Sequence, residues 1–174
     1  MLVNNMFEII VQRTISPKSL PSASKLKHWA MTALQNKVDS AELTIRIVDK
    51  DEITELNNSY RQKNKPTNVL SFPFDMPEEL TDEIPILGDI VICADVVKEE
   101  AQAQDKPEEA HWAHMVIHGT LHLLGYDHEK NHDAERMEAE EIVLLQSLGF
   151  HNPYRIKKGD KWVTTIKNAH GSNA

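Results

Sequence analysis

The sequence contains the stretch His118-Gly119-Thr120-Leu121-His122-Leu123-Leu124-Gly125-Tyr126-Asp127-His128. Its first half continues an apolar stripe that predicts a long helix from about Glu108 to Leu124, with Pro107 well placed at the helix start. Gly125 stands where helices commonly end in a left-handed residue, a conformation that glycine adopts without a Cβ clash. We therefore expect a long helix that ends at Gly125 and a chain that then turns back.

Three histidines in this stretch have the spacing of a metal site. His118 and His122 are one helical turn apart, so their side chains lie about 40° apart on one face and roughly 6 Å apart along the axis. The turn after Gly125 brings His128 toward them. One such pair alone is weak support, because histidine is common on helices, but the glycine and the third histidine at matching offsets strengthen it.

Three nitrogen ligands with an open position are typical of catalytic zinc. A structural zinc normally takes four protein ligands, usually with thiolates, and this chain has 1 cysteine. That residue, Cys93, lies in an apolar run and is expected to be buried. The sequence therefore predicts one zinc per chain, held by His118, His122 and His128.

The spacing H-x-x-x-H-x-x-G-x-x-H equals that of the metzincin proteases, in which a glutamate follows the first histidine and acts as general base. Gly119 occupies that position here and cannot take a proton. Asp127 is the nearest carboxylate, and it either braces the turn or takes part in proton transfer. His114 lies one turn before His118, and we expect it to support helix packing or a metal ligand.

The rest of the chain predicts an α+β fold. Alternating or β-branched apolar runs predict strands at 7–12, 43–49, 69–72 and 87–93. Helical spacing of apolar residues predicts a helix at 22–34, with Ser22 or Ser24 as its cap, and further helices are expected at 95–103 and 133–148. Another helix is expected to start at 51–57, with acidic residues in its first turn, and to end in the polar, basic loop that follows. We expect a sheet of about four strands covered by helices, with the metal site on a helix and the following turn.

A length of 174 residues suits one domain. We assign residues 1–155 to that domain and residues 156–174 to a basic C-terminal tail, expected to be flexible because it has too little apolar content to fold alone. The acidic, proline-containing segment 75–85 is expected to be a loop. No apolar run is long enough for a membrane span and no secretory signal is recognisable, so we expect a cytoplasmic protein with no membrane partner.

The net charge of −8 argues against a protein that coats nucleic acid through overall charge. The charge is unevenly distributed, however. Residues 75–141 hold 4 Lys and Arg against 19 Asp and Glu, whereas residues 1–74 hold 10 against 7 and residues 142–174 hold 5 against 1. A local basic surface built from the two ends therefore remains open, because only charges within about 10 Å are felt by a ligand.

The stretch 118–128 resembles the signature of the YbeY family of bacterial endoribonucleases. Three further motifs, Pro66–Pro73, Leu87–Ile90 and Ala110–His114, resemble that family in the same order. Together the motifs cover roughly residues 40 to 154. Four ordered motifs are far more specific than one.

This resemblance implies a zinc-dependent, single-strand-specific endoribonuclease that acts in 16S ribosomal RNA 3′-end maturation and in ribosome quality control. It also implies an α+β fold, the three histidines as zinc ligands, and catalytic roles for His118 and Arg61. The implied partners are RNA, the small ribosomal subunit and ribosome-associated proteins. From the residues alone, a solvated turn is the favoured interpretation of Arg61 in Arg61-Gln62-Lys63-Asn64-Lys65, although its planar guanidinium suits bidentate phosphate contact, and the resemblance reverses that preference.

Two other functions stay open from the residues. A peptidase or other small-substrate metal hydrolase is favoured by the metzincin-like spacing and by the acidic charge. A non-enzymatic ribosome assembly factor would use the zinc only for its structure.

Overall fold

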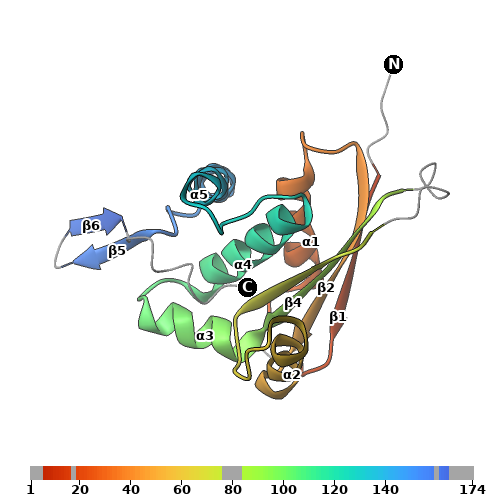
Figure 1. The fold of residues 1–174 in the computed structure, drawn as a ribbon. Helices are drawn as coiled ribbons and strands as arrows, with labels where there is room; N and C mark the ends of the chain where they lie inside the picture. The colour runs from red at the N-terminus through yellow and green to blue at the C-terminus, as the bar shows by residue number, and fades with distance from the viewer. Residues whose placement is uncertain (1–5, 17–18, 76–83, 159–160, 165–174) are drawn as a thin grey trace.

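The computed structural model describes residues 6–16, 19–75, 84–158 and 161–164, and four strands within them form one open mixed sheet (Figure 1). The strands are β1 (Met6–Arg13), β2 (Ser40–Val48), β3 (Val69–Pro73) and β4 (Ile86–Cys93), in the spatial order β1-β2-β4-β3. The first three in this order are parallel, and β3 pairs with β4 antiparallel. β3 is last in the spatial order and is therefore an edge strand. A proline, which cannot donate a backbone hydrogen bond, is tolerated at the end of such a strand.

Helices cover both faces of this sheet. α1 (Ala23–Leu34) and α4 (Glu108–Leu123) lie on one face, α2 (Lys50–Arg61) lies on the other, and α5 (Asn131–Ser147) packs on the outer side of α4. α3 (Ala94–Ala103) follows β4 directly and packs beside α4. The predicted α+β class with a four-stranded sheet is confirmed.

Alternation along β4 divides the apolar residues between two cores. Ile90 and Ile92 join the larger core under α1 and α4, whereas Val91 and Cys93 join the smaller core under α2. β4 is thus buried on both faces, which explains its nearly continuous apolar sequence. Cys93 is fully buried, as expected.

Local capping explains where two of the helices begin. The Ser22 side chain accepts a hydrogen bond from the backbone N–H of Lys25 at 3.2 Å and starts α1, so Ser22 is the cap of the two serines considered. Asp49 accepts from the N–H of Glu52 at 2.9 Å and starts α2. The sequence predicted that a helix starts in 51–57 and ends in the polar, basic loop that follows. α2 ends at Arg61, because Gln62 adopts a left-handed conformation with φ 56°.

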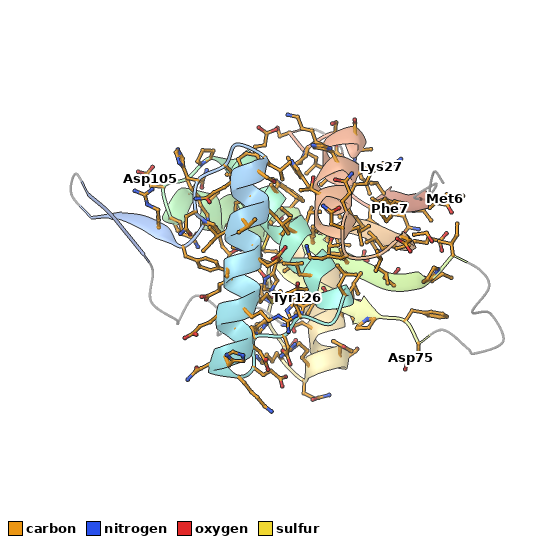
Figure 2. All side chains as sticks on the ribbon, turned by 90° about the horizontal axis from the view of Figure 1, so that it is seen from above. Met6, Phe7, Lys27, Asp75, Asp105 and Tyr126 are labelled. Atoms are coloured by element: carbon orange, nitrogen blue, oxygen red, sulfur yellow. The ribbon has the colours of Figure 1, made fainter. Side chains whose placement is uncertain are left out.

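α4 lies between the sheet and α5, and nearly all of its residues from His111 to Leu123 are buried. A helix enclosed on all sides carries apolar residues around its whole circumference. Asp105, shortly before α4, and Tyr126, shortly after it, lie at opposite ends of this helix (Figure 2). The predicted end at Gly125 is confirmed, with φ 101° at that glycine.

Two short strands follow the main domain. β5 (Arg155–Lys158) and β6 (Lys161–Thr164) form an antiparallel pair in the segment for which the sequence predicted no regular structure. The sequence predicted a flexible tail here. Strands pair through hydrogen bonds between their backbones, which the pattern of apolar residues does not reveal. Residues 165–174 and most of the acidic loop, 76–83, lie outside the described residues. In the described part of the chain, no helix is long and apolar enough to cross a membrane.

Candidate metal centre

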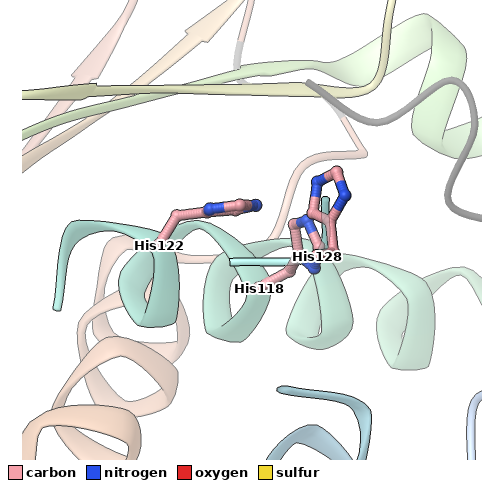
Figure 3. Close-up of side chains that lie close together, drawn as sticks. All are labelled: His118, His122 and His128. Carbon is pink, nitrogen blue, oxygen red and sulfur yellow. The ribbon is translucent and has the colours of Figure 1, made fainter. Parts of the chain in front are cut away.

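The three predicted ligands lie together at the C-terminal end of α4 (Figure 3). His118 and His122 come from the last turns of the helix, and His128 comes from the turn that follows. One nitrogen atom from each ring lies within 4.8 Å of the others. The ring centroids are 4.7 Å apart for His118 and His122 and 4.8 Å apart for His122 and His128. The structure thus brings the three histidines together as the spacing predicted.

Backbone hydrogen bonds and Asp127 shape the turn that carries His128. The N–H of Gly125 donates to His122 O and that of Tyr126 donates to Leu121 O, both at 3.0 Å. Asp127 Oδ1 accepts from the N–H groups of His128 at 2.7 Å and Glu129 at 3.2 Å. Of the two roles considered for Asp127, these contacts support bracing of the turn.

The ring nitrogens fit a metal ion. His118 Nε2 and His122 Nε2 are buried, and no hydrogen-bond partner reaches them within the described structure. Buried polar atoms are rarely left without a partner, so these nitrogens are well placed as ligands. Burial, together with His118 and His128, lowers the pKa of His122 to about 3, which keeps this imidazole in the neutral form that binds metals.

A buried carboxylate that sequence reasoning missed lies behind His118. His118 Nδ1 donates to Glu141 Oε1 at 2.6 Å, and Glu141, on α5, is fully buried. The other carboxylate oxygen accepts from His114 Nε2 at 3.2 Å and from the hydroxyl of Tyr154. A signal existed, because Glu141 stands within the apolar stripe of α5 that includes Met137 and Leu145.

These contacts set the charge of the buried group. Burial alone would raise the pKa of Glu141, but His118 and His114 hold it well below its ordinary value, so the carboxylate is ionised. Burial lowers the pKa of His114 to about 4, and the ring is therefore neutral. Glu141 thus links His114 to the predicted ligand His118, an arrangement compatible with one of the two roles expected for His114.

Gly119 lets α4 approach the sheet closely. A Cβ atom at this position would lie 2.7 Å from Ile90 Cγ2 of β4, and Ser71 Oγ of β3 donates to Gly119 O at 3.1 Å. Residue 119 therefore faces the sheet, in a space too small for a larger side chain. A metzincin-type glutamate has no room here.

Arg61 lies at the same pocket although it is far from the histidines in sequence. The pocket has a volume of about 260 Å³, and its lining includes Arg61, Ser71, His122 and His128. Arg61 is the last residue of α2 and is half-buried. Asn57 Nδ2 donates to Lys65 O at 2.8 Å and ties the following loop back to the helix.

Three clustered imidazoles beside an open pocket define a class of metal-dependent hydrolase, here on an α+β scaffold. The family model described as Endoribonuclease YbeY matches residues 12–149. The chain therefore belongs to the YbeY endoribonuclease family, whose members are metal-dependent endoribonucleases of ribosomal RNA maturation. The resemblance inferred from the four sequence motifs is confirmed.

One solved structure agrees with this assignment. The chain is similar to TM1509 from Thermotoga maritima, whose solution structure is known, with 28% sequence identity. The match covers 82% of this chain and 89% of that chain, with a TM-score of 0.57.

Proposed function

We propose that this protein is a zinc-dependent, single-strand-specific endoribonuclease that acts in 16S ribosomal RNA 3′-end maturation and in ribosome quality control. The observation that carries this proposal is that Arg61, His122 and His128 line one pocket in a member of an endoribonuclease family, with the buried His118 grouped with the other two histidines. We further propose that it acts in the cytoplasm on the small ribosomal subunit, with ribosome-associated proteins as additional partners.

The ligand set supports zinc as the metal, one ion per chain. His118, His122 and His128 supply three imidazole nitrogens and no thiolate or carboxylate, which is a common catalytic zinc set. When bound, the zinc supplies Lewis-acid polarisation of the scissile phosphoryl group and a more acidic water. His118 and His122 would hold it from the largely buried C-terminal end of α4, so the ligands would need little reorganisation.

Arg61 is the group of this pocket suited to a phosphate. Its guanidinium can donate two parallel hydrogen bonds to phosphoryl oxygens and offset the charge that grows there during cleavage. Asp127 and Glu129 line the same pocket and would repel RNA, so the cationic groups must hold the backbone. Arg61 and the metal together provide that positive charge.

The peptidase alternative loses its main support. Its sequence argument depended on metzincin-like spacing, but that chemistry needs a base at position 119, where Ile90 excludes a larger side chain. The assembly-factor alternative predicts a zinc that is closed off by the protein, whereas His122 and His128 line an open pocket.

The test uses single-stranded RNA from the 3′ region of 16S ribosomal RNA, the same RNA in a duplex, and a peptide substrate. We expect the zinc-loaded protein to cleave only the single strand, a chelator to stop cleavage, and added zinc to restore it. His122→Ala is the matched control for contaminating nucleases. Cleavage that persists in His122→Ala, or hydrolysis of the peptide instead of the RNA, would contradict the proposal.

A further inference from the structure

An exposed aromatic side chain lies at the rim of the metal pocket. Six large hydrophobic side chains are exposed in the described part of the chain, and two of them, Tyr60 and Phe74, are aromatic. Tyr60 is 48% exposed and lines the same pocket as Arg61, His122 and His128. An exposed aromatic ring at the rim of a functional pocket offers a flat apolar face to a ligand in that pocket.

The Tyr60 ring is held in place from one side. Its centroid lies 4.6 Å from that of Phe72 on β3, with an interplanar angle of 56°. Phe72 is itself half-buried and packs on the smaller core beneath α2. The ring is therefore supported by the fold and still offers almost half of its surface to a ligand. A supported ring loses little conformational entropy on binding.

Tyr60 and Arg61 are neighbours in the chain at the last turn of α2. The end of this helix is held by backbone hydrogen bonds from Gln62 to Asn58 O at 3.0 Å and from Lys63 to Asn57 O at 3.3 Å. An aromatic ring next to a guanidinium, both at one pocket, matches a base next to its phosphate in a nucleotide strand. The two side chains present these surfaces from one rigid helix end.

We propose that Tyr60 forms a base-stacking subsite, which binds an unpaired nucleobase next to the phosphate that Arg61 contacts. This inference rests on the proposed endoribonuclease function and adds a residue that recognises the substrate. It also provides a physical reason for single-strand specificity. A base in a duplex already has both faces stacked on its neighbours, whereas an unpaired base can turn out and stack on a protein ring.

The experiment measures binding of the zinc-loaded protein to a short, single-stranded 2′-O-methyl RNA by fluorescence anisotropy, with the oligonucleotide checked for intactness afterwards. We expect Tyr60→Ala to raise the Kd about tenfold, as stacking contacts with single-stranded nucleic acid typically do, and Tyr60→Phe to stay within about twofold of wild type. Val143→Ala is the control, because it truncates another exposed hydrophobic side chain, on α5, that is 60% exposed. It should leave the Kd unchanged.

A second arm separates stacking from a merely structural role of the ring. An abasic site is moved along the oligonucleotide one position at a time. At the position that stacks on Tyr60, we expect the abasic site to weaken binding to wild type about tenfold and to have no further effect on Tyr60→Ala. Tyr60→Leu keeps apolar contact with Phe72 without an aromatic face, and it should bind as weakly as Tyr60→Ala.

Zinc content and unfolding free energy are measured for every variant. Unchanged binding by folded Tyr60→Ala or Tyr60→Leu, or an abasic effect that adds to the loss of Tyr60 at every position, would overturn the subsite while leaving the endoribonuclease proposal intact. If zinc-loaded wild type neither binds nor cleaves single-stranded RNA, both proposals fail.

Discussion

At the scale of single residues, Glu141 decides which nitrogen of His118 can bind a metal. Its ionised carboxylate accepts a hydrogen bond from Nδ1 of His118 at 2.6 Å. This contact engages Nδ1 and leaves Nε2 as the nitrogen that can bind the metal. His114 and Tyr154 occupy the second carboxylate oxygen and hold the group in one orientation. The ligand geometry of α4 thus depends on a residue of α5.

We predict that Glu141→Gln lowers zinc affinity by about 10- to 100-fold, the usual cost of losing a carboxylate behind a ligating histidine. The amide keeps the size of the side chain, but it removes the negative charge and presents a donor to the groups that now donate to Glu141. Competition with a chromophoric chelator measures the affinity. Glu135→Gln, an exposed position on the same helix, serves as control. Equal zinc affinity in both variants would contradict this role.

A second residue-scale prediction concerns Arg61, which we propose as a catalytic group. Arg61→Ala should lower RNA cleavage by about 100-fold or more, roughly 3 kcal/mol, while the protein keeps its zinc and its fold. Arg61→Lys should recover little, because lysine lacks the planar pair of donors. Lys98→Ala removes an exposed positive charge from α3 and should change the rate by well under 1 kcal/mol. Near wild-type cleavage by zinc-loaded Arg61→Ala would contradict a catalytic role of Arg61 and would indicate a solvated surface residue.

At the scale of elements, the contact between α4 and β4 positions the metal centre. Gly119 permits this contact, because a Cβ atom there would overlap the branched side chain of Ile90. The close approach also sets the depth of His118 and His122, which flank this residue on the same helix.

We predict that Gly119→Ala destabilises the fold by about 1–3 kcal/mol, as overpacking in a core does. The direction of the change in unfolding free energy is informative, because a glycine-to-alanine substitution inside an unobstructed helix stabilises by about 1 kcal/mol. Denaturant unfolding measures the change. The effect should shrink or reverse in an Ile90→Ala background, where the opposing methyl group is absent. An equal cost in both backgrounds would show that Ile90 is not the cause.

At the scale of the whole molecule, the proposed metal site depends on folding, because α4 and the turn after it must both form before the three histidines lie together. His118 and His122 lie on α4, whereas His128 follows the turn at Gly125. An ion that binds this arrangement and not the unfolded chain shifts the folding equilibrium toward the native state.

We therefore predict that zinc at 100 times its Kd raises the free energy of unfolding by about 2.7 kcal/mol, and that a chelator removes this gain. Chemical denaturation with and without zinc measures the difference. In His122→Ala, which lacks one ligand, zinc at the same concentration should produce little of this stabilisation. Equal stabilisation of the variant and wild type would place the zinc at another site.

Local sequence determined most of the elements of this protein and the cluster of three histidines. The periodicity of apolar residues predicted the four strands of the main sheet and five helices, with boundaries displaced by a few residues. Two histidines one turn apart, followed by Gly125 and His128, predicted the metal site, because all of its ligands lie within one helix and its turn. Such short-range patterns follow from backbone geometry alone.

Tertiary structure alone decided what surrounds those ligands. Glu141 reaches His118 from another helix, Tyr60 and Arg61 reach the pocket from the end of α2, and Ile90 closes the space at Gly119. Each of these contacts joins segments that local periodicity treats separately, and their meeting depends on how the sheet and helices pack around the shared core.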